Sequence, residues 1–322
     1  MVLTMLPELR CLANLQCGVV TRRQALACGM TERQFKTSTQ PGGAWVVVRR
    51  GAYVERWEWD AADDAGRHLM RVVAVTLVAH EPYVVSHSSA AVVHGLACRP
   101  HWRELIHLSH PGVRGGRTEG GAKHHPTGVP ESQIVEVNGI AVTSLARTGI
   151  DIAREHGIED GVTACDQVLG RGVPIAELQS VLTQMWSWPN VTKARAAVAW
   201  ADPGADNMGE SLARMLVVEL GFGAPATQVR IEDEGRRVRV DMLLEGHVIE
   251  FDGQIKYAGE FGSGTPALWQ EKQREDWLRS LGLGVSRIIW SDMFGTARTE
   301  TLRRLRREYL ATQERRFARR VS

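Results

Sequence analysis

The first hydrophobic pattern along the chain is helical. Leucines recur every three residues over 7–16 and predict an amphipathic helix there. Two capping-box patterns follow, each a threonine with a glutamine three positions later, beginning at Thr21 and Thr31. They predict a short helix that stops at Gly29 and a second helix over 31–38. Two short helices joined by a glycine-containing turn are typical of a helix-turn-helix.

After this helix pair the spacing becomes that of β-strands. Apolar runs at 45–48 and 52–54 predict two strands, joined by a basic turn that carries Arg49 and Arg50. A helix pair followed by such a hairpin is the arrangement of a winged helix-turn-helix. We therefore expect a first domain over 1–58.

This domain resembles the N-terminal winged helix-turn-helix of AbiE-type antitoxins, over about 50 residues. The resemblance implies DNA binding. Arg33, Gln34 and Lys36 on the second helix would reach base edges or phosphates, and Arg49 and Arg50 would contact the backbone. The alternative is a winged helix that docks a protein or is purely structural.

The middle region, 59–195, mixes the two periods and predicts a mixed α/β domain. A glycine-rich segment, 111–121, separates its two predicted strands and is expected to be a flexible loop that can touch nucleic acid. A protein partner bound through this region also remains open. The predicted helices are 66–80, 88–96, 146–154, 159–169 and 175–185, and the predicted strands are 104–108 and 134–138.

Histidines are concentrated in this middle region. Seven of them fall within residues 68–110, and none of these seven has the i, i+4 spacing with a carboxylate that a helical zinc site needs. We expect them at packing or surface positions. The seven in the stretch are His68, His80, His87, His94, His101, His107 and His110.

The last region, 196–322, has the predicted order α-β-β-β-α-β-α, and its second and third strands form a hairpin. If Glu245 and Gly246 are a two-residue turn, Asp241 stands directly opposite Glu250. Cross-strand neighbours have Cβ atoms only ~4.5–5.5 Å apart, and like charges there repel unless a cation lies between them. Asp252 shares the face of Glu250. These carboxylates predict a site for a hard divalent cation.

The element order, with Glu210 in its first helix, Asp241 on its second strand and Glu250 on its third, resembles the restriction-endonuclease-like PD-(D/E)XK fold. More narrowly, about 115 residues look like relatives of the very-short-patch-repair endonuclease. The motifs that carry this resemblance are Ile249-Glu250-Phe251-Asp252-Gly253, Glu271-Lys272-x-Arg274-Glu275 with Leu278, Arg279 and Gly282, and Val285-x-Arg287-x-x-Trp290.

The resemblance implies hydrolysis of DNA phosphodiesters with Mg²⁺ or Mn²⁺, with Asp241 and Glu250 as cation ligands, joined by Asp252. Glu210 would contribute through water or a second ion, or it would instead pair with Arg214 at i, i+4. This makes Glu210, Asp241 and Glu250 the expected catalytic acids.

One position departs from the simplest motif, which has lysine two residues after the second acid. Asp252 stands there, and Lys256 is the expected catalytic cation instead. The alternative is that Lys256 only pairs with Asp252, in which case activity would depend on Lys272 or be absent. Three further cations are expected to clamp phosphate oxygens: Lys272, Arg279 and Arg287. The alternative is that these cations neutralise Glu271, Glu275 and Asp276.

Composition changes this picture little. A chain of 322 residues has room for two or three domains, and the five cysteines are scattered without a Cys-x-x-Cys pair, which argues against disulfides and structural zinc. No long apolar run or signal-peptide pattern is present, so a cytoplasmic protein with no membrane partner is expected. A homodimer remains open. The competing function is a non-catalytic DNA-binding regulator or antitoxin whose nuclease-like domain has degenerated.

Overall fold

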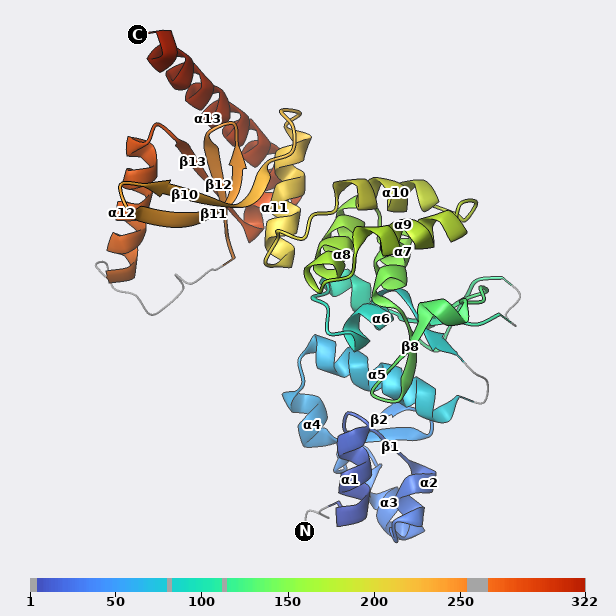
Figure 1. Ribbon diagram of the computed structural model, residues 1–322. Helices are drawn as coiled ribbons and strands as arrows, with labels where there is room; N and C mark the ends of the chain where they lie inside the picture. The colour runs from blue at the N-terminus through green and yellow to red at the C-terminus, as the bar shows by residue number, and fades with distance from the viewer. Residues whose placement is uncertain (1–4, 80–82, 112–114, 254–265, 322) are drawn as a thin grey trace. The chain divides into compact units, whose positions relative to one another are not determined.

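The computed structural model describes residues 5–79, 83–111, 115–253 and 266–321, with side chains over 269–318 in the last segment (Figure 1). Within these residues the chain is a mixed α/β protein with thirteen α-helices and three β-sheets. The mixed α/β class predicted from the sequence is thus confirmed.

Contacts along the chain divide it into two compact units. Unit 1 comprises 1–164 and 173–198, and unit 2 comprises 165–172 and 199–322. The N-terminal segment and the middle region therefore belong to one unit, and the region with the acids belongs to the other.

Unit 1 begins with the helix pair and hairpin that the sequence predicts. Both capping boxes are present, with Thr21 and Thr31 each accepting a hydrogen bond from the backbone N–H of the glutamine three positions later. The strands pair in the order β1-β3-β2, all antiparallel. The elements are α1 (Pro7–Leu15), β1 (Val20–Thr21), α2 (Arg22–Ala27), α3 (Glu32–Ser38), β2 (Trp45–Arg49), β3 (Ala52–Glu55) and α4 (Arg56–Ala61).

A six-stranded sheet follows in the same unit, with helices of which only the last residues of α8 and α10 belong to unit 2. Its strand order is β6-β7-β5-β4-β9-β8, with β4 parallel to β9 and β5 parallel to β7. The elements are α5 (Asp64–Val78), β4 (Val84–Val85), α6 (His87–Val93), η1 (Pro100–Arg103), β5 (Ile106–Ser109), β6 (Arg117–Glu119), β7 (Ala122–His125), η2 (Glu131–Gln133), β8 (Ile134–Val137), β9 (Ile140–Thr143), α7 (Leu145–His156), α8 (Ile158–Gly170), α9 (Ile175–Gln184) and α10 (Val191–Trp200).

The prediction of a flexible loop over 111–121 is wrong for its second half. β6 and β7 form a hairpin there, joined by Gly120 and Gly121 with φ of 55° and 77°. Left-handed backbone at both turn positions is what a two-residue hairpin turn requires, and glycine adopts it without strain. The glycines that were interpreted as flexibility thus form a specific turn.

The N-terminal helices and hairpin share one hydrophobic core with the middle region. Val54 of β3 packs in the same buried cluster as Val73 of α5 and Val142 of β9. Helix α5 therefore shares one buried core with strands of both segments.

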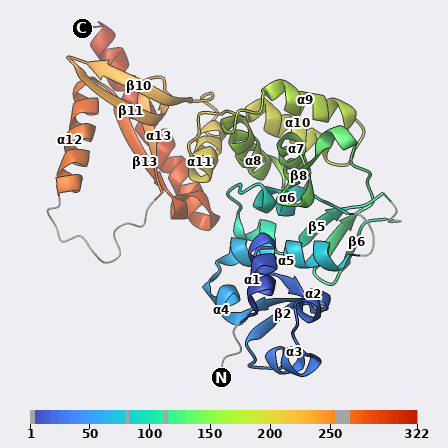
Figure 2. The same ribbon diagram turned by 60° about the horizontal axis from the view of Figure 1, so that its bottom comes forward.

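Unit 2 is a four-stranded sheet covered by helices on both faces (Figures 1 and 2). The strand order is β10-β11-β12-β13, antiparallel except for the parallel pair β12 and β13. Helices α11 and α13 pack on one face and α12 on the other. The elements are α11 (Met208–Glu219), β10 (Ala226–Asp233), β11 (Arg236–Leu244), β12 (His247–Asp252), α12 (Pro266–Ser280), β13 (Gly284–Ile289), η3 (Trp290–Met293) and α13 (Gly295–Val321).

No helix in the described part of the chain is both long and apolar enough to cross a membrane.

Candidate functional site

The hairpin that carries the acids has the predicted turn and three of the four predicted residue pairs. Glu245 and Gly246 both have positive φ, 46° and 83°, as a tight two-residue turn requires. The predicted pairs Leu244–His247, Leu243–Val248 and Met242–Ile249 are all present. The fourth predicted pair is wrong, because the ladder between the described strands ends at Met242–Ile249 and does not set Asp241 directly opposite Glu250.

Beyond the pair Met242–Ile249, the side chain of Asp241 bonds to the neighbouring strand in place of a regular backbone pair. Oδ2 of Asp241 accepts a hydrogen bond from the backbone N–H of Phe251 at 2.9 Å. Asp241 is thereby anchored across the strand beside Glu250. Burial is the largest influence on both carboxyls and raises the pKa of each, and the charge of Asp241 raises that of Glu250 further.

Glu210 reaches the same acids from the first turn of α11. Asn207 caps the helix by accepting from the backbone N–H of Glu210 at 3.1 Å. Burial raises the pKa of Glu210, and the charge of Asp241 adds to that rise against the hydrogen bond from Asp206. The charge of Asp241 thus raises the pKa of both glutamates.

Hydrogen bonds fix the carboxylate of Glu210 in place. It accepts from the backbone N–H of Asp206 at 2.8 Å, from Nδ2 of Asn207 at 2.6 Å and from Nε2 of Gln228 at 2.9 Å. A glycine brings its helix close to the hairpin, since a Cβ on Gly209 would lie 2.1 Å from the ring of Phe251. The sequence motif did not indicate Gln228, which lies on the edge strand β10.

The suggested pair of Glu210 with Arg214 is wrong. Arg214 instead donates from Nη2 to both oxygens of Asp166, at 3.0 and 2.8 Å, and from Nη1 to the carbonyl of Trp200 at 2.8 Å. Asp166 is fully buried, and burial raises its pKa in opposition to the arginine. Arg214 therefore neutralises Asp166, and the charge of Asp241 acts on Glu210 instead.

Arg274, which the sequence motifs did not assign to the site, forms an ion pair with Glu250. Nη2 of Arg274 is 2.6 Å from Oε1 of Glu250, and its Nη1 donates to Oε2 at 3.1 Å. Arg274 also donates to the carbonyl of Arg239 at 2.8 Å. Helix α12 thus places a fixed positive charge against one of the expected cation ligands.

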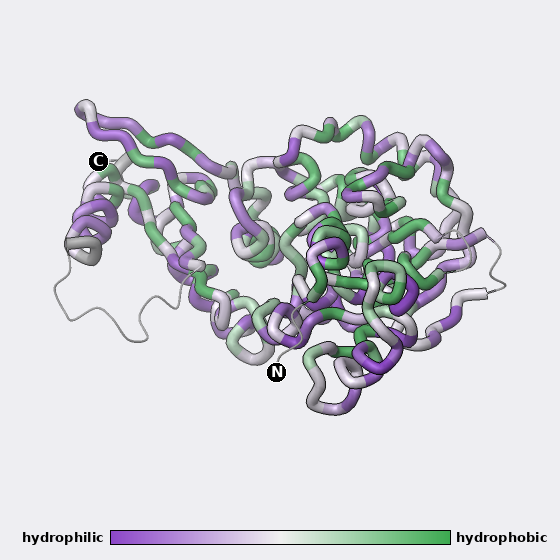
Figure 3. Tube along the Cα trace, turned by 90° about the horizontal axis from the view of Figure 1, so that it is seen from below, coloured by the Kyte–Doolittle hydropathy of each residue, from purple (hydrophilic) through white to green (hydrophobic). Residues whose placement is uncertain are grey.

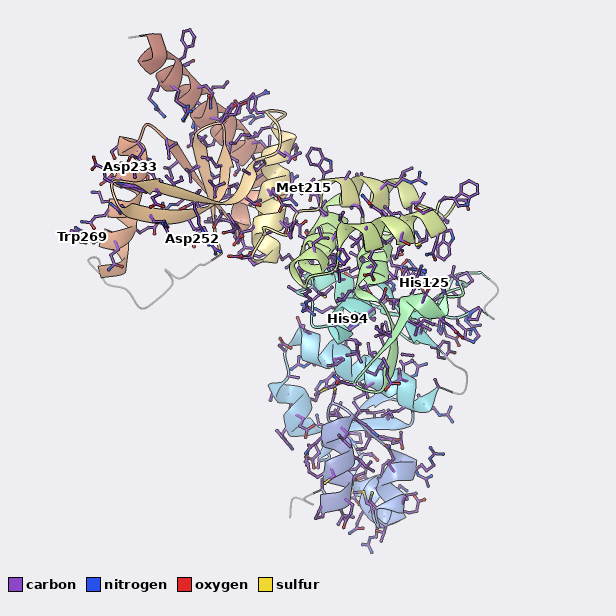
Figure 4. The ribbon with its side chains drawn as sticks, viewed as in Figure 1. His94, His125, Met215, Asp233, Asp252 and Trp269 are labelled. Carbon is purple, nitrogen blue, oxygen red and sulfur yellow. The ribbon has the colours of Figure 1, made fainter. Side chains whose placement is uncertain are left out.

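Asp252 ends β12 and is half-buried, at the point where the grey trace of Figure 4 begins. Lys256, the expected catalytic cation, lies outside the described residues. Within those residues, the ligand oxygens of the acids do not gather within 4.8 Å of one another.

The cations expected on phosphate are largely engaged with acids. Arg287 pairs with Glu271 at 2.5 Å and with Glu275 at 3.4 Å, and Arg279 pairs with Glu275 at 2.6 Å. Lys272 is exposed on the largely hydrophilic α12, the purple helix that adjoins the long grey trace in Figure 3. Arg279 and Arg287 thus have the positions expected if these cations neutralise nearby acids.

The side chains expected to contact DNA differ in their exposure and in their contacts. Arg33 and Lys36 of α3 and Arg50 in the turn between β2 and β3 are exposed. Gln34 completes a capping box by accepting from the backbone N–H of Thr31 at 2.8 Å. Arg49 points to the neighbouring hairpin, where its Nη1 donates to the carbonyl of Gly120 at 3.4 Å.

Two histidine-containing groups were not predicted as potential ligand sets. Within the described residues, ligand atoms lie within 4.8 Å of one another in two groups, His87 with His107 and His125, and His101 with His156 and Asp160. Their members come from separate elements, so the i, i+4 rule applied to the sequence could not find them.

Comparison with known proteins gives distant relatives only. No family model matches the chain. The chain is similar to two proteins of Mycobacterium tuberculosis, uncharacterized protein MT2308 of strain CDC 1551 / Oshkosh and uncharacterized protein Rv2248 of strain ATCC 25618 / H37Rv. Each is 25% identical over 256 residues, which cover 77% of this chain and 89% of the relative.

Proposed function

We propose that this protein is a cytoplasmic DNA-binding endonuclease in which unit 2 hydrolyses DNA phosphodiesters with Mg²⁺ or Mn²⁺. The observation that carries the proposal is the electrostatic coupling of three carboxyls, Glu210, Asp241 and Glu250, whose pKa values are all raised. Buried acids that repel one another are costly to the fold, and perturbed groups of this kind concentrate at functional sites.

The chemistry of these side chains fits a hard divalent cation. All of the donors are carboxylate oxygens, and such a cation would offset both their burial and their mutual repulsion. When bound, it would supply positive charge for the transition state of phosphodiester cleavage and lower the pKa of an attacking water. Asp241 and Glu250 would hold it, with Asp252 at the end of the same strand as a further ligand.

The remaining residues have roles that follow from their contacts. Glu210 is held in one orientation by its donors, as a group that positions water beside the cation requires. Arg274 pairs with Glu250 in the metal-free chain, and it would donate to a phosphate oxygen once a cation takes its place at Glu250. By the resemblance to PD-(D/E)XK enzymes, Lys256 would stabilise charge on the scissile phosphate.

The winged helix-turn-helix would hold the DNA. Arg33, Lys36 and Arg50 form its exposed cationic set, and exposed cations at a recognition helix and a wing are suited to phosphate contacts. Because Arg49 is turned toward Gly120, we assign it a secondary part.

A second candidate is a non-catalytic DNA-binding regulator, and one contact favours it. Arg274 forms an ion pair with Glu250 in the place where a cation ligand would be needed, and Asp252 stands where the simplest motif has lysine. In this alternative the arginine replaces the metal permanently, and unit 2 is a scaffold.

Cleavage assays separate the two candidates. Purified full-length chain is incubated with supercoiled, linear and mismatched DNA in Mg²⁺, in Mn²⁺ and in EDTA. The endonuclease predicts cleavage that EDTA abolishes and that Asp241→Asn and Glu250→Gln each reduce roughly 100-fold or more. Asp233→Asn is the matched control, because Asp233 is an exposed acid at the end of β10 (Figure 4). Intact DNA binding without cleavage in any metal would support the regulator instead.

A further inference from the structure

A group of potential ligands in unit 1 is separate from the acids of unit 2. It consists of His101 on η1, His156 at the C-terminal end of α7 and Asp160 in the first turn of α8. One ligand atom from each lies within 4.8 Å of the others. The group has the composition of a two-histidine, one-carboxylate metal site, which is common for zinc and non-haem iron.

The distances within the group are close to those of a coordination shell. Nε2 of His101 is 2.8 Å from Oδ2 of Asp160, and the rings of His101 and His156 meet edge to face, with centroids 5.4 Å apart and planes at 75°. Bonds of ~2.0–2.1 Å in a tetrahedral site place neighbouring ligand atoms roughly 3.3 Å apart. Small movements of exposed His101 would therefore complete such a geometry.

His156 supplies an observation that internal packing leaves unexplained. Its Nε2 is buried and has no hydrogen-bond partner among the described residues. Buried polar atoms without a partner are rare, and an ion is one of the few reasons for them. The ring is fixed against Trp102, with planes at 15° and centroids 5.8 Å apart.

The surroundings support Asp160 and leave access to the group. Nη1 of Arg99 donates to Oδ1 of Asp160 at 2.5 Å, so the second oxygen remains directed at His101. Outer hydrogen bonds of this kind orient carboxylate ligands. A pocket of about 340 Å³ is lined by Arg99, His156, Asp160 and Lys193, among others. A small ligand or water can reach the group through it.

We propose that His101, His156 and Asp160 bind a borderline divalent cation of the Zn²⁺ class, with an open coordination position facing this pocket. Imidazole ligands favour such a cation over Mg²⁺, which prefers oxygen ligands. The site would join η1 to the junction of α7 and α8. It is independent of the carboxylates assigned to DNA cleavage.

The other histidine group is less suited to a cation. The rings of His87 and His125 are stacked 3.8 Å apart with planes at 12°, and His125 Nε2 is 3.0 Å from Nδ1 of His107. The nitrogens of the two stacked rings do not converge on one point, and the nitrogens of His107 and His125 can form a hydrogen bond with each other. This buried group, to which His125 in Figure 4 belongs, fits the packing role expected from the sequence.

Zinc retention by variants tests the proposal. Full-length chain is stripped with EDTA, dialysed, and equilibrated with Zn²⁺ in an excess of Mg²⁺ before the bound metal is measured. We expect one Zn²⁺ per chain, and we expect His101→Ala to weaken binding roughly 100-fold or more, because loss of an outer partner alone costs 10–100-fold. His101→Asp keeps a ligand and should recover part of the affinity.

Controls separate this site from the others in the chain. Asp241→Asn and His125→Gln should retain Zn²⁺ as the wild type does, and added Zn²⁺ should raise the apparent melting temperature of the wild type but not of His101→Ala. His101 is exposed, so its replacement should leave the fold intact, which far-UV circular dichroism verifies. The proposal is overturned if the wild type holds no Zn²⁺ against Mg²⁺, or if His101→Ala holds as much as the wild type.

Discussion

Arg274 of α12 and Glu250 of β12 form an ion pair, with Nη2 2.6 Å from Oε1. The pair links the helix on one face of the unit 2 sheet to the strand that carries two of the proposed cation ligands. It means that Glu250 already has a positive partner when no metal is bound. Metal binding at the acids must therefore compete with this arginine.

Removing the arginine should expose this competition. Without Arg274, the buried carboxylate loses its partner, and an unpaired charge of this kind, partly reached by solvent, costs about 1–3 kcal/mol. We expect Arg274→Gln to lower the free energy of unfolding in EDTA. We also expect Mg²⁺ to raise its melting temperature more than it raises that of the wild type. An Mg²⁺ response equal to that of the wild type would mean that arginine and metal do not share Glu250.

The acids should make the metal-free protein less stable as the pH rises. The pKa of Asp241 and of Glu250 is raised from ordinary values of 3.8 and 4.5, so the folded chain binds protons more tightly than the unfolded chain. The stability that these groups contribute is fully present below their pKa values in the unfolded chain. It is lost as the pH rises through their higher pKa values in the folded chain. Melting temperatures in EDTA from about pH 4 upward measure the slope, which Asp241→Asn should flatten and Asp233→Asn should not.

A bound cation should reverse that trend. Positive charge at the carboxylates favours their ionised forms and lowers their pKa. In saturating Mg²⁺ we expect the loss of stability with rising pH to disappear in the wild type. A pH profile that is the same with and without Mg²⁺ would argue against a cation at these acids.

The buried pair of Arg214 and Asp166 should be important for the stability of unit 2. Removing one partner of a buried ion pair costs about 3–5 kcal/mol because the remaining charge is uncompensated. We expect Arg214→Met to lower the urea midpoint sharply, and the double variant with Asp166→Leu to recover much of the loss. A single variant as stable as the wild type would mean that the pair contributes little.

The proposed DNA binding should depend on the exposed cations of α3 and of the turn between β2 and β3. Replacing Arg33 and Arg50 with alanine removes two phosphate contacts, and each contact contributes about 0.9 to the slope of log affinity against log salt. We expect weaker binding and a flatter slope by fluorescence anisotropy. Arg195→Ala, an exposed arginine on α10, is the control. Unchanged affinity in the double variant would assign DNA contact to another surface.

Local patterns predicted most of what depends on neighbouring residues. The capping boxes at Thr21 and Thr31 and the turn at Glu245 are found as expected, because each is fixed by a few adjacent side chains. The first three pairs of the acid hairpin follow from that turn, but the pair of Asp241 with Glu250 does not form, because the Asp241 side chain accepts from the backbone N–H of Phe251 instead. The same reasoning failed at Gly120, where a hairpin turn and a flexible loop share one composition.

Contacts between distant elements were beyond such patterns. Nothing near Arg214 in the sequence indicates Asp166, 48 positions earlier, and nothing near Glu250 indicates that Arg274 will reach it. The ligand group of His101 and Asp160 likewise forms only when η1 meets the start of α8. Such pairs depend on tertiary packing, which a single sequence does not specify by spacing.

The most direct test of the central claim is the initial rate of plasmid cleavage by the full-length chain in Mg²⁺, with Asp241→Asn compared with Asp233→Asn. The proposed endonuclease predicts cleavage by the wild type and by Asp233→Asn at similar rates, and a rate for Asp241→Asn lower by roughly 100-fold or more. Equal cleavage rates for the wild type and both variants, or the absence of any cleavage that EDTA abolishes, would contradict it.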